Sequence, residues 1–189
     1  MERNAALSRE RTEPQLVKAA AAGDRDAFDL LVKRHFQPVF RLALRVLGNR
    51  EDAEDLQQEA FVQAYRNLHR FHGDSALGTW LYSITVRLCL TRKRSKMMRQ
   101  QEAVELVPSL DPSPNEDPET RLLALESAVR VQHTLLQLSP PDRLLVVLKY
   151  VEGLSHEEIA RVFGCSAASS RSRLARAKRL FRESYERRE

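Results

Sequence analysis

A cluster of prolines in the second half of the chain places the strongest limit on its fold. Half of the eight prolines fall within one short stretch, at Pro108, Pro112, Pro114 and Pro118. Residues 101–120 also hold six acidic residues and no basic residue. Proline lacks the N–H that a helix needs, and like charges keep a segment extended in water. We therefore predict a linker at 99–122.

The segments on either side of this linker follow a helical pattern. An N-terminal tail (1–14) precedes a first domain (15–98), and a second domain occupies 123–189. Apolar residues recur at helical spacing in both domains, and no segment alternates apolar and polar residues with a period of two. We predict an all-α protein of two small helical domains, joined by an acidic, proline-rich linker.

Local signals define three helices in the first domain. Asp24 can cap the first helix, which Gly48 would end. Pro38 lies inside this helix and is expected to bend or break it. A second helix is expected from about Glu51 and a third from near Thr79.

The second domain shows the pattern of a helix-turn-helix. Ser139 and Ser155 each begin a capping-box pattern at the start of a helix. Gly164 breaks the short helix that follows Ser155, and Ser166 can cap a longer helix after it. A short helix, a tight turn containing glycine and a longer helix make up a DNA-binding helix-turn-helix.

The longer helix is strongly basic, with no acidic residue from 166 to 182. Its cations repel one another unless a polyanion meets them, and its first turn would enter the major groove. An arginine there can pair with guanine through two hydrogen bonds, worth about 1–3 kcal/mol of discrimination. The alternative is a basic face exposed only to water. The six cations are Arg171, Arg173, Arg176, Lys178, Arg179 and Arg182.

The first domain carries two further surfaces of distinct chemistry. One helix bears acids and amides without histidine or cysteine at metal-ligand spacing, which favours a solvated or partner-facing surface over catalysis. Residues 70–96 combine aromatic and cationic side chains, which suit single-stranded nucleic acid. The first set is Asp52, Glu54, Asp55, Gln58, Glu59 and Gln63. The second set includes Phe71, His72, Trp80, Tyr82, Arg87, Arg92, Lys93, Arg94 and Lys96.

The remaining features argue against several other classes of protein. There is no nucleophile elbow and no glycine-rich phosphate loop, so we expect neither an enzyme nor a cofactor site. Cys89 and Cys165 lack partners at metal spacing and imply no disulfide framework, so a cytoplasmic location is expected. No apolar run approaches the roughly 20 residues that cross a bilayer. A net charge of +5 fits a nucleic-acid partner only weakly.

Three motifs in order resemble a known family. Residues 49–61 resemble the acidic helix, DAEDL-x-QE-x-F, of extracytoplasmic-function (ECF, group 4) sigma factors of the sigma-70 family. Residues 71–84 look like the loop and following helix of that family, and residues 150–177 look like its helix-turn-helix. The resemblance covers roughly residues 15–183.

This resemblance implies a role for each surface. Domain 2 (15–98) would bind the clamp helices of the largest subunit of core RNA polymerase and would capture and melt the −10 element. Domain 4 (123–189) would contact the polymerase beta flap and read the −35 element as duplex promoter DNA. The polymerase-binding residues would be Asp52, Asp55, Gln58 and Glu59. The −10 residues would be Phe71, His72, Gly73, Asp74, Ser75, Trp80, Arg87, Lys93 and Arg94. The −35 residues would be Ser166, Ser169, Arg171, Ser172, Arg173, Arg176 and Lys178.

The resemblance also implies control by an anti-sigma factor, often bound to the inner membrane. The chain departs from the family at Arg87, where asparagine is usual, and at Ser170, where an aliphatic residue is usually buried. The alternative is a stand-alone helix-turn-helix regulator that binds duplex operator DNA. The sequence leaves the arrangement of the two domains open, since a flexible linker permits both a compact and an extended form.

Overall fold

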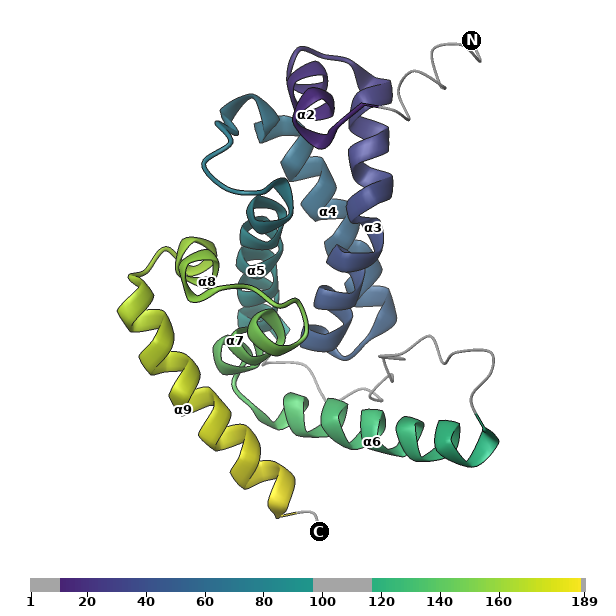
Figure 1. Cartoon of the computed structure of the whole chain (residues 1–189), viewed down its shortest axis with the longest axis vertical. Helices are drawn as coiled ribbons and strands as arrows, with labels where there is room; N and C mark the ends of the chain where they lie inside the picture. The colour runs from purple at the N-terminus through teal and green to yellow at the C-terminus, as the bar shows by residue number, and fades with distance from the viewer. Residues whose placement is uncertain (1–10, 97–116, 188–189) are drawn as a thin grey trace.

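The structure is a computed structural model that describes residues 11–96 and 117–187 (Figure 1). Within these two ranges every regular element is helical, as the sequence predicts. The first domain contains α2 (Glu13–Ala21), α3 (Arg25–Leu47), α4 (Arg50–Asn67), the short 3₁₀ helix η1 (Leu68–Arg70) and α5 (Leu77–Lys96). The second contains α6 (Pro118–Gln137), α7 (Pro140–Tyr150), α8 (His156–Phe163) and α9 (Ala167–Glu186).

Helix α3 continues through Pro38, so the expectation of a break at this proline is wrong. A proline inside a helix removes one hydrogen bond and costs about 3 kcal/mol. Leu31 and Val39 are buried on either side of it and fix α3 against its neighbours. Gln57 of α4 also donates a hydrogen bond to the carbonyl of Phe36, at 2.5 Å. Tertiary packing therefore outweighs the local cost of the proline.

The ends of the helices in the first domain follow the capping signals closely. The Asp24 carboxylate accepts a hydrogen bond from the N–H of Ala27 at 3.0 Å, and this bond lowers the pKa of Asp24. Gly48 ends α3 in the left-handed conformation, with φ 76°. Asn49 caps α4, which begins at Arg50, close to the predicted start. Helix α5 begins two residues earlier than predicted.

The predicted caps of the second domain are confirmed. Ser155 accepts from the N–H of Glu158 at 3.1 Å, and the Glu158 carboxylate accepts from the N–H of Ser155 at 2.8 Å. Ser166 accepts from the N–H of Ser169 at 3.1 Å. Gly164 ends α8 with φ 62°, where a side chain would be strained. These caps fix the two helices of the helix-turn-helix.

Two helices start inside segments that the sequence assigns to connecting chain. Helix α2 begins at Glu13, inside the range given to the N-terminal tail. Helix α6 begins at Pro118, inside the range given to the linker, and proline suits the first turn of a helix. Residues 99–116 of the predicted linker and residues 1–10 lie outside the described residues.

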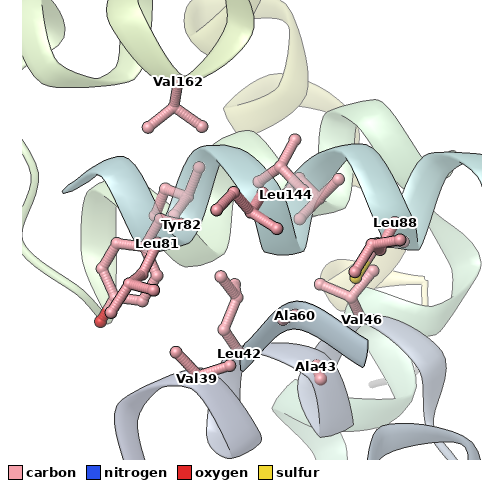
Figure 2. Packing of buried hydrophobic residues seen from close by; sticks show 14 of the residues in the cluster. Val39, Leu42, Ala43, Val46, Ala60, Leu81, Tyr82, Leu88, Leu144 and Val162 are labelled. Atoms are coloured by element: carbon pink, nitrogen blue, oxygen red, sulfur yellow. The ribbon is translucent and has the colours of Figure 1, made fainter. Parts of the chain in front are cut away.

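Both domains contribute to one buried apolar cluster. Figure 2 shows Leu42 of α3 and Leu81 of α5 in the same packed region as Leu144 of α7 and Val162 of α8. Helices α7 and α8 lie against α5, and α6 passes the end of α3 (Figure 1). The two domains are therefore packed directly on one another.

Candidate nucleic-acid interface

Helices α8 and α9 form the helix-turn-helix that the sequence predicts. The turn is closed by a hydrogen bond from the N–H of Cys165 to the carbonyl of Ala160, at 2.9 Å. Helix α9 buries Ser170, Leu174 and Ala177, which lie one helical turn apart. This face packs on the domain, so the opposite face of α9 is left exposed.

The exposed face of α9 carries the residues predicted to read the −35 element. Arg171, Ser172, Arg176 and Lys178 are exposed, as is Ser166 at the helix cap. Ser169 and Arg173 are half-buried. The structure thus gathers all seven predicted residues on the first three turns of one helix and its cap.

Two arginines on this face form ion pairs with carboxylates of the same domain. Arg171 lies 3.7 Å from Glu157, and both side chains are more than half exposed. Arg176 lies 3.1 Å from Asp142, with 64% of its own side chain exposed. The exposed pair of Arg171 and Glu157 contributes only about 0–1 kcal/mol, so a phosphate could replace Glu157 at little cost. The side chain of Asp142 is only 8% exposed, so freeing Arg176 would leave a buried carboxylate without that partner.

Arg173 occupies a different position on α9. Its guanidinium lies over the ring of Phe163, 5.0 Å from the ring centre. This contact holds the arginine between α8 and α9. The first turns of α9 would face the major groove of DNA. A cation–π contact of this kind fixes the direction of the side chain without neutralising its charge.

Ser170 is fully buried at the position where the family usually has an aliphatic residue. Its hydroxyl has no hydrogen-bond partner among the residues that the structure describes. A buried hydroxyl without a partner costs free energy. An aliphatic side chain at this position would therefore hold α9 against the domain more tightly than Ser170 does.

The four residues predicted to bind polymerase lie along α4. Asp55 and Gln58 are exposed, whereas Asp52 and Glu59 are half-buried. The Glu59 carboxylate accepts a hydrogen bond from Arg92 of α5 at 3.3 Å, and the same guanidinium binds the carbonyl of Asp52 at 3.1 Å. Glu59 therefore also connects α4 to α5, whereas Asp55 and Gln58 face outward.

The loop before α5 presents the predicted −10 residues. Phe71 and Trp80 are half-buried and their rings lie 5.3 Å apart, while the tip, His72, Gly73 and Asp74, is exposed. Gly73 has φ 81°, a conformation that glycine adopts readily and that this turn requires. Ser75 lies half-buried at the base of the loop.

The basic part of the −10 set lies along α5. Arg87 is exposed. Lys93 and Arg94 lie in the last turns of the helix, but their side chains are outside the described part of the structure. Tyr82 departs from the predicted aromatic surface because it is buried rather than available for stacking.

Two family models match the chain in the order that the motifs predict. Residues 31–98 match Sigma-70 region 2, and residues 128–181 match Sigma-70 region 4. The chain is 36% identical over 169 residues to the ECF RNA polymerase sigma factor SigM of Mycobacterium tuberculosis, covering 89% of this chain and 82% of that protein. The chain belongs to the ECF RNA polymerase sigma factors. It is also 35% identical to the ECF sigma-E factor of Escherichia coli K12, over 91% of this chain and 93% of that protein.

Solved structures agree with this sigma-factor fold. A structure of CnrH in complex with the cytosolic domain of CnrY matches with a TM-score of 0.64 at 27% identity, covering 89% of this chain and 93% of that one. The sigma factor RpoE of Bartonella quintana, solved with the anti-sigma factor NepR, matches with a TM-score of 0.63 at 21% identity, covering 84% of this chain and 96% of that one. At 21% identity, the similarity to RpoE shows a shared fold and nothing more.

A buried polar cluster joins the two sigma domains. We call it the interdomain triad: Arg45 of α3, Tyr82 of α5 and Glu152, which follows α7. Glu152 lies 3.6 Å from Arg45 and accepts a hydrogen bond from the hydroxyl of Tyr82 at 2.5 Å. Burial, then the Glu152 bond and charge, raise the pKa of Tyr82, and burial lowers the pKa of Arg45.

Sequence reasoning missed the polar residues that hold the domains together. Arg45 was detectable as a cation within an apolar run from Leu42 to Val46. Arg143 stands next to Leu144 at the start of α7 and is fully buried, but no feature of its neighbours marks it as internal. Glu152 looks like an ordinary surface acid beside a glycine. Their roles depend on which chain segments meet in space, and the sequence does not specify that locally.

Proposed function

We propose that this sigma factor recruits core RNA polymerase to promoters and reads the two promoter elements with separate domains. The observation that supports the proposal is the polar face of α9, where five of the seven residues predicted to read the −35 element are exposed and two are half-buried. Ser169, Ser172 and Arg173 would contact base edges of the −35 element. Arg171, Arg176 and Lys178 would bind the flanking phosphates.

The loop before α5 would capture unpaired bases of the −10 element. Its exposed tip can surround a base, and Phe71 and Trp80 provide aromatic faces beside it. Unstacking a base costs a few kcal/mol, so a site that holds the exposed base favours strand separation. Arg87, Lys93 and Arg94 would then hold the backbone of the displaced strand.

The exposed side of α4 would bind the clamp helices of the polymerase largest subunit. Asp55 and Gln58 would make the direct contacts, with Asp52 and Glu59 at the edge of the surface. Domain 4 would contact the beta flap. In this scheme the protein acts by binding alone, and the polymerase supplies all of the chemistry.

An anti-sigma factor would control the chain. The similar proteins CnrH and RpoE were each solved with a second chain bound, and RpoE's partner is named as an anti-sigma factor. No helix among the described residues is long and apolar enough to span a bilayer. We propose that the chain works in the cytoplasm, and that any attachment to the membrane comes from the anti-sigma factor.

Reconstituted transcription tests the proposal. Core polymerase, this protein and a pool of promoter fragments are combined, and the 5′ ends of the RNA are sequenced. We expect discrete start sites that depend on the protein and share elements about 10 and about 35 bases upstream. Without such starts and without co-elution with core polymerase, the proposal is wrong, and footprinting of duplex DNA would then test the stand-alone regulator.

A further inference from the structure

The pair of Arg176 and Asp142 joins the face of α9 assigned to the −35 element to the start of α7. The guanidinium of Arg176 donates a hydrogen bond to Oδ2 of Asp142 at 3.1 Å. The two ends of the pair differ in exposure, because 64% of the Arg176 side chain is exposed and only 8% of the Asp142 side chain is. The cation therefore reaches solvent, while the carboxylate that holds it lies inside the domain.

The carboxylate of Asp142 is fixed by α7 itself. Asp142 lies in the first turn of this helix, which Ser139 caps. The Ser139 hydroxyl donates a hydrogen bond to Oδ2 of Asp142 at 2.5 Å. A carboxylate in the first turn is also favoured by the helix dipole. Asp142 is thus held in place whether or not Arg176 is bound to it.

The backbone of α9 is fixed on both sides of Arg176. Leu174 and Ala177 are buried and belong to the apolar core. The freedom left to Arg176 lies in its long side chain, which loses conformational entropy when it is ordered. The hydrogen bond to Asp142 fixes the end of that side chain before any DNA is bound.

Arg171 has a different kind of partner on the same helix. Glu157 of α8 lies 3.7 Å from it, and both side chains are more than half exposed. A phosphate could replace Glu157, because exposed ion pairs contribute little. Replacing Asp142 in the same way would leave a buried carboxylate without its cation, which is strongly unfavourable. We therefore expect Arg176 to keep its carboxylate when DNA binds.

Arg176 can hold Asp142 and a phosphate at the same time. A guanidinium has several N–H donors arranged in a planar fork. One donor binds Asp142, and the exposed remainder of the group can bind a phosphate oxygen. Phosphate contacts set the register of a protein on the duplex. A guanidinium of fixed direction therefore favours one register over the others.

We propose that Asp142 is a positioning residue for the −35 element: it stays paired with Arg176 in the promoter complex and directs the guanidinium at one phosphate. This inference rests on the proposed function, which assigns Arg176 to a phosphate beside that element. An acidic side chain near a DNA-binding face repels phosphates, so by charge alone its removal should tighten binding. Positioning predicts the opposite sign on the intact element, because a free Arg176 must be ordered anew in each complex.

The first measurement uses the free, full-length chain. Nuclear magnetic resonance relaxation at the Nε–H of Arg176 reports the order of its side chain. We expect an order parameter above about 0.6 in the wild type and below about 0.6 in Asp142→Ala. Arg182, exposed near the end of α9, is the internal reference and should be mobile in both proteins.

The second measurement uses the holoenzyme reconstituted with core RNA polymerase. Its affinity is measured for labelled promoter fragments from the transcription experiment, with the −35 element intact or scrambled. Asp142→Ala should bind the intact element about two- to tenfold more weakly, the effect of leaving one long side chain to be ordered. Its affinity for the scrambled element should stay the same or rise. Arg176→Ala should lower the salt slope by about one, whereas Asp142→Ala should keep the slope of the wild type.

A double-mutant cycle separates positioning from a structural role. If Asp142 acts through Arg176, Asp142→Ala should have no further effect on the intact element once Arg176 is alanine. Ser139→Ala is the matched control, because it removes the cap of α7 but leaves the carboxylate for Arg176. This control should lower the Tm and keep the affinity for the intact element.

Two further variants complete the design. Glu157→Ala removes the exposed carboxylate beside Arg171, so it should bind both fragments at least as tightly as the wild type. If Asp142→Ala loses helical circular dichroism, Asp142→Asn replaces it. The asparagine keeps an oxygen for Ser139 and Arg176 but not the charge, so the loss on the intact element should be smaller and of the same sign.

The outcomes keep positioning apart from function. A mobile Arg176 in the wild type overturns the inference, as does tighter binding of Asp142→Ala to the intact element. An equal loss in Ser139→Ala, or a loss that persists when Arg176 is alanine, shows a structural role and overturns it too. A wild-type holoenzyme that binds the intact and scrambled elements alike overturns the proposed function. In that case the order of Arg176 in the free chain still decides whether Asp142 holds it.

Discussion

The guanidinium of Arg143, on α7, donates a hydrogen bond to the carbonyl of Val46, near the end of α3. The same group donates to the carbonyls of Leu135, Leu136 and Leu138 at 2.7–3.2 Å. The last carbonyls of a helix have no partners within the helix. One arginine therefore supplies donors to the ends of two helices from different domains. Burial lowers the pKa of Arg143 to about 10, so it stays charged at neutral pH.

Replacing Arg143 should destabilise the fold severely. Arg143→Met fills similar space but leaves buried carbonyls without donors, at about 1–3 kcal/mol for each unsatisfied group. We expect a loss of at least about 3 kcal/mol in the free energy of unfolding, measured by urea denaturation followed by circular dichroism. Arg182→Met, on the exposed side of α9, is the control and should change stability by less than about 0.5 kcal/mol. Similar stability of the two variants would contradict this role for Arg143.

Local chemistry explains why the sequence predicted the helices and most of their ends. The pairs Asp24 with Ala27 and Ser155 with Glu158 are three residues apart, so their hydrogen bonds need no other part of the chain. The exposed face of α9 follows from the same helical spacing. Capping and periodicity are local properties, and a single sequence displays them directly.

Apart from shifted helix starts, the wrong or missing expectations concern contacts between distant segments. Pro38 does not break α3, because Gln57 of α4 binds α3 beside it and the buried residues Leu31 and Val39 pack α3 on its neighbours. Tyr82 is an aromatic residue that could stack on a base, yet its hydroxyl donates a hydrogen bond to Glu152, 70 positions away. Which residue meets which across the domains depends on the assembled core. Neither propensity nor spacing contains that information.

Ser170→Ala should stabilise the protein. The Ser170 hydroxyl is buried and has no hydrogen-bond partner among the described residues, and alanine is the better helix former. We expect a gain of about 1 kcal/mol in the free energy of unfolding, seen as a higher Tm. Ser172 lies two residues further along α9 and is exposed. Ser172→Ala should therefore gain only the small difference in helix propensity. A lower Tm for Ser170→Ala would show that the hydroxyl is satisfied in solution.

The capping box of α8 should make part of the stability depend on pH. The N–H and the hydroxyl of Ser155 lower the pKa of Glu158 below its ordinary value of 4.5. A carboxyl whose pKa is lowered by folding contributes stability above its unfolded pKa and loses it as the pH falls through the folded value. Glu158→Gln should therefore be less stable than the wild type at pH 7, and the difference in Tm should shrink below about pH 4.5. A difference that is constant from pH 7 to pH 3 would exclude this contribution.

Arg173→Ala should weaken the reading of the −35 element more than the binding of polymerase. Loss of one bidentate base contact costs about 1–3 kcal/mol, or roughly 5- to 150-fold in affinity for the preferred sequence. Transcription from promoters with intact and scrambled −35 elements measures the effect, and co-elution measures polymerase binding. Arg182→Ala removes a cation from the same helix and should weaken all sequences alike. Equal loss of promoter reading and polymerase binding in Arg173→Ala would contradict the assignment.

Asp55 and Glu59 should respond differently to replacement, although both belong to the predicted polymerase surface. Asp55 is exposed, so Asp55→Ala should leave stability unchanged and weaken binding to core polymerase at least about fivefold, near 1 kcal/mol. Glu59 binds Arg92 across α4 and α5, so Glu59→Ala should also lower the Tm. Fluorescence titration of labelled protein with core polymerase measures the affinity, and thermal melting measures the stability. Glu59→Gln keeps a hydrogen-bond acceptor for Arg92 and separates the two roles: it should recover part of the Tm without restoring the charge. If Asp55→Ala binds polymerase as tightly as the wild type, the interface lies elsewhere on domain 2.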